Sequence, residues 1–265
     1  MRATGAVLLL VCLAPTFYAQ QPQGQSNRSD GGATSVMRDG GVDQVLQSIY
    51  IPPLQNAPFT AIIHTQWIRP LGDGGTYTLV NQRQVARDSA GRIYEERWLL
   101  VPKDGKVESQ MNVIQIADPS AHTLYNCFTL NTPHRCVLLD YSETPLKAIA
   151  PPTMMSGPLP NGNGSSLHED LGGQSIEGID TRGTRDTVTY NEGVIGNDRP
   201  FSSVREFWYA PSLGINLKSE VSNPSFGKQI FTLSDIVTAE PDPKLFQLPD
   251  GFQVVDRRKP AAPSQ

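Results

Sequence analysis

The feature that most constrains this chain is a repeating pattern of β-prone segments that begins at Phe59. FTAIIHTQWIRP and GTYTLVNQRQVARD are rich in Thr, Ile, Val, Tyr and Trp, and the turn LGDGG separates them. RIYEERWLLVPK, MNVIQIAD, HTLYNCFTL and RCVLLDY follow, with the turns KDGK and DPSA among them. Turn signals at this spacing predict a continuous antiparallel meander.

The strand pattern stops over residues 142–166, a segment rich in Pro, Gly and Ser, and then resumes. Further strands are predicted at QSIEGI, TRDTVTY, SVREFWYA, GINLKSEV and GKQIFTLSDIV. The sequence therefore predicts a mainly β protein, with a curved antiparallel sheet or incomplete β-barrel of roughly ten strands. One or two short helical segments are expected beside it, the first at Val42–Tyr50, where apolar residues recur at helical spacing before Pro52.

Several of the predicted strands are apolar on both faces. Trp98 and Leu100 share one face of their strand, while Leu99 and Val101 share the other. An antiparallel sheet with one face in water alternates more cleanly than this. Either both faces are covered, or the sheet curls around an apolar interior.

The two ends of the chain differ from the strand region. Residues 1–19 combine Arg2, an apolar run and Ala19, which is typical of a signal peptide cleaved before Gln20, and the run is too short for a membrane anchor. Residues 20–41 and 257–265 are expected to be a disordered leader and a disordered tail. The sequence thus predicts an exported protein, periplasmic or secreted, with a single domain over residues 42–256.

Composition and cysteine content narrow the possible partners. The formal net charge is −4 at pH 7, so a nucleic-acid partner is not expected.

Once the signal peptide is removed, Cys127 and Cys136 remain, and a turn at Asn131–Pro133 places them on facing strands. In an oxidising compartment this predicts a disulfide. Two buried thiols, or a metal-binding pair near His122 and His134, are the alternatives.

The run His168-Glu169-Asp170 raises the question of a catalytic acid/base cluster. Adjacent residues on an extended chain point to opposite faces, so the three side chains cannot converge, and we interpret the run as a solvated loop before a strand. The pair Gly172-Gly173 lacks the Lys-Ser/Thr of a phosphate-binding loop. No catalytic residue, metal site or cofactor is predicted.

The segment after this run is typical of a β-hairpin. A strand is expected to end near Ile179 and to meet a tight turn built on Asp180 and Gly183, with a positive φ at Gly183. The second strand is then expected to run from Thr184 to Tyr190.

The C-terminal part carries a resemblance to a known family. EPDPKLFQLPDGFQVVDRRK (Glu240–Lys259) resembles the ending of periplasmic lipoprotein carriers of the outer-membrane lipoprotein-sorting family, and RDSAGRIYEE looks like their strand–turn–strand with a D-x-x-G turn. REFWYAPSLGINL and NPSFGKQIFTLSDI are similar to uncharacterised secreted bacterial proteins of that superfamily. The resemblance implies an incomplete antiparallel barrel around a hydrophobic cavity that holds lipid or acyl chains.

We therefore expect a non-enzymatic extracytoplasmic protein that binds a hydrophobic ligand or a lipidated partner, with transient association with the membrane or an envelope protein. The candidate ligand contacts are Trp67, Trp98, Trp208, Met154 and Met155, although large aromatics also serve as plain core. The loop over residues 142–166 is interpreted either as a lid or as a surface excursion. An envelope interaction or sensor module, and a hydrolase with an unrecognised site, are the alternative functions.

Overall fold

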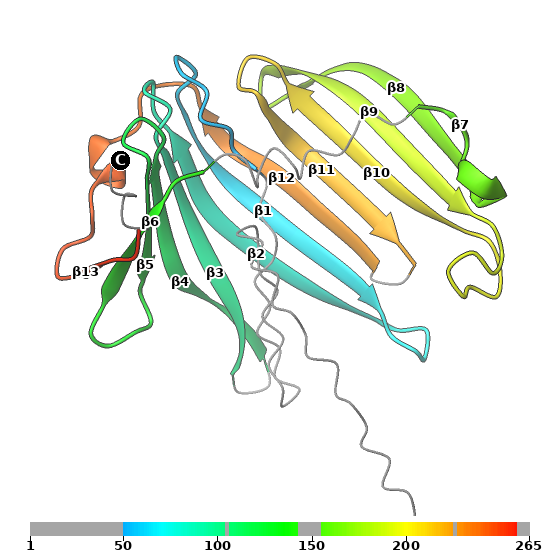
Figure 1. The fold of residues 1–265 in the computed structure, drawn as a ribbon, viewed down its shortest axis with the longest axis horizontal. Helices are drawn as coiled ribbons and strands as arrows, with labels where there is room; N and C mark the ends of the chain where they lie inside the picture. Colours follow the sequence, from blue (N-terminus) through cyan, green and yellow to red (C-terminus); the bar gives the residue numbers. More distant parts are fainter. Residues whose placement is uncertain (1–49, 104–105, 143–154, 225–226, 259–265) are drawn as a thin grey trace, which may run out of the picture.

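The computed structural model describes residues 50–103, 106–142, 155–224 and 227–258, and within these ranges the chain forms one thirteen-stranded sheet (Figure 1). The strands are β1 (Phe59–Pro70), β2 (Thr76–Arg87), β3 (Ile93–Lys103), β4 (Lys106–Asp118), β5 (Thr123–Phe128), β6 (Arg135–Asp140), β7 (Gly157–Pro158), β8 (Gly164–Ile176), β9 (Ile179–Tyr190), β10 (Phe201–Ala210), β11 (Ile215–Asn223), β12 (Gly227–Val237) and β13 (Gln253–Asp256). Two short 3-10 helices, η1 (Pro160–Gly162) and η2 (Pro243–Phe246), accompany them. Neither described helix is long and apolar enough to span a membrane.

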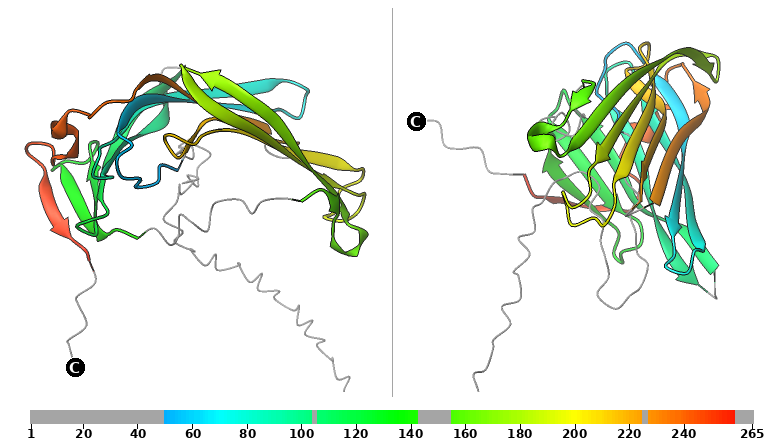
Figure 2. Two further views of the ribbon diagram at one scale, coloured as in Figure 1. Left: turned by 90° about the horizontal axis from the view of Figure 1, so that it is seen from above. Right: turned by 90° about the vertical axis from the view of Figure 1, so that its right-hand side faces the viewer.

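The order of strands across the sheet is β13-β6-β5-β4-β3-β2-β1-β12-β11-β10-β9-β8-β7. β1 to β6 form one antiparallel meander and β7 to β12 another, and the pairing of β1 with β12 joins them. Only β13 adds in a parallel direction, beside β6. The sheet curves into an open trough whose two end strands, β13 and β7, lie far apart (Figure 2). The predicted curved antiparallel sheet is therefore confirmed.

The register assigns each side chain to one side of the trough, because directly opposed residues on neighbouring strands share a face. Phe59 on β1 lies opposite Arg87 on β2. Arg87 donates hydrogen bonds to the carbonyl oxygens of Pro52 and Ala57. These residues belong to the segment before β1, which lies in the hollow of the trough (Figure 2). We call this side the concave face and the other side the convex face.

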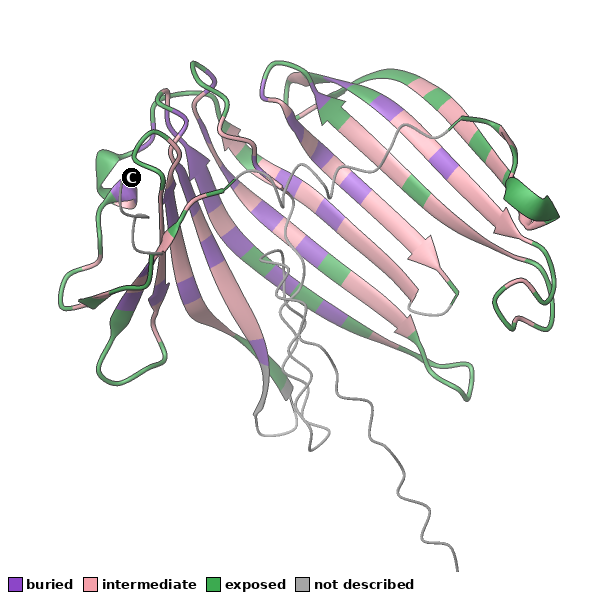
Figure 3. Cartoon of the chain, in the orientation of Figure 1, coloured by how far each residue is buried: buried purple, intermediate pink, exposed green. Residues whose placement is uncertain are grey.

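The main core lies on the concave face, where the segment before β1 and the β10–β11 turn cover the sheet. Its buried residues are Ile51, Phe59, Ala61, Ile63, Val85, Ile93, Ala117, Ala210, Leu213, Ile215, Leu217, Phe231 and Leu233. Burying a Val, Leu, Ile or Phe side chain stabilises a fold by about 1.5–3 kcal/mol. Buried positions are dense from β2 to β6 and become sparse toward β8 (Figure 3).

A second, smaller core lies on the convex face. Phe246 of η2 packs with Ala86, Tyr94 and Ile116 of β2, β3 and β4. The Arg92 guanidinium also lies 4.8 Å from the centre of the Phe246 ring. The sheet is therefore covered on both faces near β3, which explains why that strand is apolar on both sides.

Arg87 is a fully buried cation at the centre of the concave core. Its guanidinium donates four hydrogen bonds, two to Ala57 O (3.0 and 2.8 Å), one to Pro52 O (2.8 Å) and one to Leu213 O (2.6 Å). Burial lowers the pKa of Arg87 to about 10. A single side chain thus ties the segment before β1 and the β10–β11 turn to the sheet.

The D-x-x-G turn expected between β2 and β3 is present. Asp88 accepts hydrogen bonds from Arg92 N (2.7 Å) and Arg92 Nε (2.6 Å), and Gly91 N donates to Asp88 O. Gly91 has φ +85°, and a Cβ there would lie 3.0 Å from the carbonyl oxygen of Pro53. The turn therefore needs glycine both for its backbone conformation and for the close passage of the segment before β1.

The predicted number of strands was too low, and one predicted turn was wrong. Thirteen described strands replace roughly ten, because β7 and β13 are very short and carry no strand pattern of their own. The strand predicted at QSIEGI in fact begins at Gly164, so the end of the proline-rich segment forms β7, η1 and the start of β8. The β8–β9 turn is made by Glu177 (φ 52°) and Gly178 (φ 78°) and not by Asp180 and Gly183 as predicted.

Gly183 lies inside β9 and has no positive φ, contrary to the prediction. A Cβ at this position would lie 2.7 Å from the Trp208 ring and 2.9 Å from Leu171 Cβ. Glycine is therefore required at residue 183 by the packing of an indole across the sheet, and not by a turn.

Several predicted features lie outside the described residues. These are the signal peptide at 1–19, the leader at 20–41, most of the helix at Val42–Tyr50, Met154, the first part of the 142–166 loop and the end of the tail.

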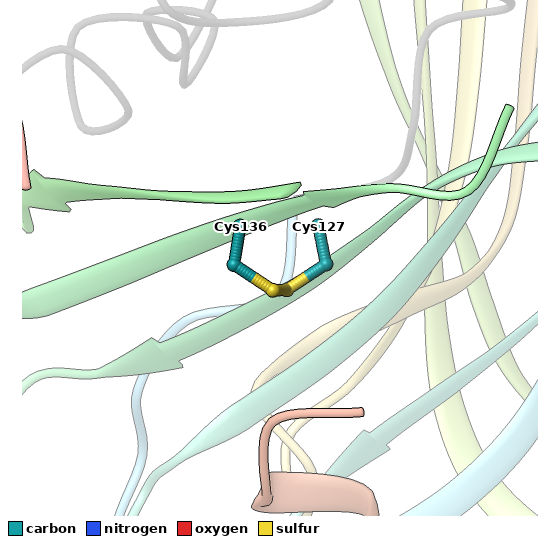
Figure 4. Close-up of a disulfide and its surroundings, with 2 residues drawn as sticks. All are labelled: Cys127 and Cys136. Atoms are coloured by element: carbon teal, nitrogen blue, oxygen red, sulfur yellow. A yellow bond between two sulfur atoms is a disulfide. The ribbon is translucent and has the colours of Figure 1, made fainter. Parts of the chain in front are cut away.

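The predicted disulfide between Cys127 and Cys136 is confirmed (Figure 4). The two residues are directly opposed on β5 and β6, and both are fully buried. The bond closes the hairpin next to the end of the sheet that carries β13.

Replacing Arg87 tests whether it holds the covering segments in place. Arg87→Met removes four hydrogen bonds and leaves three carbonyl oxygens buried, so we expect the free energy of unfolding to fall by about 3 kcal/mol or more. Urea unfolding followed by circular dichroism measures this. Arg199→Met, at an exposed turn residue, is the matched control and should change stability by less than about 0.5 kcal/mol. Equal stabilities of the two variants would contradict the assigned role.

Removing the disulfide should also destabilise the fold. The sequence separation is 9, so the chain-entropy model gives somewhat under 3 kcal/mol (about 2.7) for the Cys127→Ala/Cys136→Ala double variant. Urea unfolding of the two proteins under identical conditions measures the difference. In the unreduced wild-type protein neither cysteine should react with an alkylating reagent after denaturation, and labelling of both would show that the bond does not form.

Candidate functional site

Over β8 to β12 the convex face of the sheet carries ion pairs, whereas the concave face carries mainly apolar side chains. On the convex face, Arg185 of β9 lies between Glu206 of β10 (Nη2–Oε2 2.8 Å) and Glu169 of β8 (Nη1–Oε2 3.9 Å). Lys218 of β11 contacts Glu206 at 3.5 Å. Lys228 and Glu220 form a further pair at 2.7 Å. We call these residues the convex ladder: Glu169, Arg185, Glu206, Lys218, Glu220 and Lys228.

The ladder shifts the pKa of its central groups. Burial alone would raise the pKa of Glu206, but hydrogen bonds from Trp208 and Arg185 and the charge of Lys218 outweigh it, so this pKa is lowered. The pKa of Arg185 is raised by its hydrogen bond to Glu206. Every cation of the ladder is therefore matched by a carboxylate, as suits a face in contact with water.

On the concave face the same strands carry apolar side chains. The register aligns Tyr190 with Phe201, and their rings are 5.4 Å apart. It also aligns Phe207 with Ser219 and then Phe231, across β10, β11 and β12. We call the apolar set the concave stripe: Trp67, Val188, Tyr190, Phe201, Phe207, Val221 and Phe231. All except Phe231 are only half-buried, so the stripe is accessible.

One end of the stripe lies on β1 and β2, around Trp67. The Arg69 guanidinium lies 4.8 Å from the Trp67 ring centre and 5.6 Å from that of Tyr77, and it donates to Tyr77 Oη at 2.9 Å. Trp67 and Tyr77 also pack against the buried pair Leu79 and Leu100. This end of the stripe is therefore a firmly built aromatic surface.

The other end of the stripe carries charged groups. Asp186 of β9, which is 8% exposed, accepts from His168 Nδ1 of β8 at 2.6 Å. Arg205 of β10 lies directly opposite Asp186 and is exposed. The concave face thus changes from apolar to charged between β12 and β8.

A second group of charges lies on the concave face where β2 and β3 separate. Glu95 lies 3.7 Å from Arg97, and burial raises the pKa of Glu95 although Arg97 and Arg83 oppose the shift. Burial lowers the pKa of Arg83 to about 10. Arg97 also donates to Gln115, which in turn donates to Asn126 at 2.7 Å. The hollow is therefore not lined by apolar groups alone.

The three predicted tryptophans are not brought together. Trp67 lies on the concave face, opposite Leu79. Trp98 and Trp208 lie on the convex face, where each indole Nε1 donates to the glutamate two residues before it: Trp98 to Glu96 (3.0 Å) and Trp208 to Glu206 (2.8 Å). Contact of these two tryptophans with a ligand stays a prediction, and the geometry favours Trp67.

Glu96 serves a structural purpose on the convex side. It accepts from Tyr94 Oη and Trp98 Nε1 at 3.0 Å each, and from the backbone N–H of Gln84 at 3.1 Å. Burial and the nearby Glu96 carboxylate raise the pKa of Tyr94 well above its usual range. Regular pairing of β2 with β3 stops at Val85, so this carboxylate replaces the missing backbone acceptor.

The remaining predicted contact lies away from the stripe. Met155 is 85% exposed just before β7, and its carbonyl oxygen accepts from Ser166 Oγ at 2.6 Å. Met154 lies outside the described residues, so the predicted methionine surface stays a prediction.

The run His168-Glu169-Asp170 does not form a catalytic cluster. It lies on β8 and not in a loop, which corrects the predicted location. His168 contacts Asp186, Glu169 faces Arg185 on the convex side, and Asp170 accepts from Gly172 N at 2.8 Å. The argument that adjacent side chains diverge was correct. Within the described ranges no three His, Cys, Asp or Glu side chains are grouped as metal ligands.

One serine–histidine contact invites comparison with a nucleophile and its base. His64 Nε2 and Ser234 Oγ are 2.7 Å apart on the convex face. Ser234 Oγ also lies 3.1 Å from Asp235 Oδ2, so this carboxylate competes with the imidazole for the single proton of the serine. When the serine donates to Asp235, His64 donates to the serine and does not act as its base.

Sequence reasoning missed Arg205, Asp186 and the two Glu-x-Trp pairs. A signal for the pairs existed, because Glu96 with Trp98 and Glu206 with Trp208 have the two-residue spacing that places side chains on one face of a strand. No such signal marked Arg205, since a charged residue in an alternating strand is normally expected to face water.

No protein-family model matches the chain, and no curated protein matches it. Solved structures do match. MucB of Pseudomonas aeruginosa, in a complex with MucA, is 15% identical over 76% of this chain and 59% of that chain, with a TM-score of 0.36. LppX, a lipoprotein of Mycobacterium tuberculosis, is 11% identical over 69% of this chain and 88% of that one, with a TM-score of 0.31.

A lipoprotein-sorting protein domain from Vibrio parahaemolyticus also matches, with 11% identity over 71% of this chain and 89% of that one and a TM-score of 0.27. The chain spans less than two thirds of MucB. With identities and TM-scores this low, no ligand or partner is transferred, and the proposals below rest on the geometry of this chain.

The convex ladder predicts a specific dependence of stability on pH. The lowered pKa of Glu206 means that its ionised form stabilises the fold above its ordinary pKa of about 4.3, and that this stability is lost as the pH falls through the lower folded value. Glu206→Gln should therefore be less stable than wild type at pH 7, with a difference that shrinks as the pH drops below about 4.

Urea midpoints measured from pH 7 to pH 3 give this difference directly. Glu192→Gln, at an exposed turn residue, is the matched control and should parallel wild type throughout. A gap between wild type and Glu206→Gln that stays constant with pH would show that Glu206 is not held in its ionised form by the ladder.

Proposed function

We propose that this protein is a non-enzymatic, extracytoplasmic binding protein whose concave stripe holds a hydrophobic ligand, either a free amphiphile or the acyl chain of a lipidated partner. The observation that carries the proposal is the difference between the faces of β8 to β12. The convex face carries matched ion pairs, and the concave face of the same strands carries half-buried aromatic and aliphatic side chains.

Contiguous accessible apolar surface on a soluble domain generally marks a binding site. The stripe extends from Tyr190 and Phe201 across three further strands to Trp67, with Ser219 and Gln229 as polar members of its rows, and the sheet curves toward this face. Large aromatic side chains bury about 150–250 Å² each, so even partial coverage by an acyl chain is favourable.

The disulfide supports the extracytoplasmic location. Structural disulfides form and persist in oxidising compartments and are rare in the cytosol. Cys127 and Cys136 are both fully buried, so their bond is part of the β5–β6 hairpin and not an exposed redox centre.

A pair of matched valine variants tests the site. Val221 lies on the concave stripe, and Val204 lies on the convex face of the neighbouring strand, opposite Ser222. Both are half-buried. The neutral dye N-phenyl-1-naphthylamine, which fluoresces in apolar surroundings, should bind wild type and Val204→Asn alike. Its affinity for Val221→Asn should be about tenfold weaker, because an amide that is buried without a hydrogen-bond partner costs about 1–3 kcal/mol.

Circular dichroism and urea unfolding establish that both variants are folded. Failure of wild type to bind the dye, or equal binding by the two valine variants, would reject the concave stripe as a ligand site.

A further inference from the structure

Arg205 differs from the three cations of the convex ladder. Arg185, Lys218 and Lys228, on the convex face, each contact a glutamate. Arg205 lies on the concave face, beside Phe207 and opposite Val221, and within the described part of the chain it makes no hydrogen bond or ion pair. It is therefore an exposed guanidinium within an apolar stripe.

The nearest carboxylate to Arg205 is already engaged. Asp186 lies directly opposite Arg205, yet it accepts from His168 on its other side, at 2.6 Å. The next acidic residue on this part of the concave face, Asp170, accepts from Gly172 N. The described residues thus supply no carboxylate that closes on Arg205, whereas they do so for each cation of the convex ladder.

Two neutral polar groups lie on the same face as Arg205. Ser203 is two residues away on β10, whereas Gln229 lies two strands away on β12, between Val221 and Trp67 in the same row. Neither side chain is hydrogen-bonded to a described residue. Ser203 thus offers a second donor beside Arg205, and Gln229 places one amide along the row that leads to Trp67.

The geometry points to a ligand with one anionic head and one apolar chain. We propose that Arg205 binds the carboxylate of a fatty acid whose chain lies along the stripe toward Trp67; this rests on the proposed function. From β10 to β1 there are three strand spacings, or about 14 Å, which a medium-length acyl chain covers. The planar guanidinium pairs with a carboxylate through two parallel hydrogen bonds. Ser203 is the one further described donor beside Arg205 on this face, which suits a carboxylate better than the larger head of a phospholipid.

Amphiphiles with the same chain length and different head groups distinguish the contribution of the head to the binding affinity from that of the chain. Calorimetric titration with dodecanoate and with dodecyl maltoside, both below their micelle concentrations at pH 8, should give about tenfold tighter binding of dodecanoate to wild type. Arg205→Gln should remove this preference and leave the affinity for N-phenyl-1-naphthylamine within about twofold. Arg199→Gln, an exposed arginine in the β9–β10 turn, is the matched control and should keep the preference.

The outcomes are distinct. If Arg205→Gln binds dodecanoate as tightly as Arg199→Gln does, the assignment of the head site is overturned while the concave stripe stands. If lysophosphatidylglycerol is preferred over lysophosphatidylcholine in an Arg205-dependent way and dodecanoate is not preferred, the ligand is a phospholipid and the fatty-acid proposal is overturned. If wild type binds none of these probes, including the dye, the proposed function itself fails.

Discussion

The buried guanidinium of Arg87 is the interaction on which the concave side of this protein depends. An open sheet has two faces, and the described part of this chain has only two short 3-10 helices with which to cover them. Here the covering elements are an extended segment before β1 and the turn between β10 and β11. Neither has a backbone ladder to the sheet, so both present carbonyl oxygens that need donors. Arg87 supplies those donors from β2.

Burying a cation without a carboxylate partner is costly, and the lowered pKa of Arg87 reflects that cost. Three carbonyl dipoles and the Phe59 ring, 5.0 Å from the guanidinium, offset it. A neutral side chain could not bridge two loops and a strand at once. The arrangement concentrates the fixed core at one part of the trough, and the stripe on β9 to β12 is left half-exposed.

Much of the fold was predictable because it follows from local pattern. The segment FTAIIHTQWIRP is β1 in full, and the other long strands lie close to their predicted ranges. The Cys127–Cys136 pairing followed from a hairpin turn and the parity of the cysteine count. The prediction of the β8–β9 turn was wrong because one residue type, glycine, serves two different structural purposes here. Gly178 makes the β8–β9 turn and Gly183 makes room for Trp208, and no local pattern distinguishes these two uses.

The candidate site was harder to predict because it depends on which face of the sheet is concave. Trp67, Trp98 and Trp208 have the same strand-like surroundings in the sequence, yet one faces the hollow and two donate to glutamates on the other side. The side is set by the curvature and by the β1–β12 pairing, which joins residues far apart in the chain. The alternation of side chains along a strand assigns each residue to one of two faces, but only the tertiary structure determines which of these faces is concave.

This dependence also explains why Arg205 appears ordinary in the sequence. In an isolated alternating strand, Arg205 and Glu206 are simply neighbouring charges on opposite faces. The fold places Glu206 among Arg185, Lys218 and Trp208, where its charge is fully used. It places Arg205 among Val221, Phe207 and an aspartate already engaged with His168. Two adjacent charges thus acquire different roles, one structural and one available to a ligand, because the sheet curves toward only one of them.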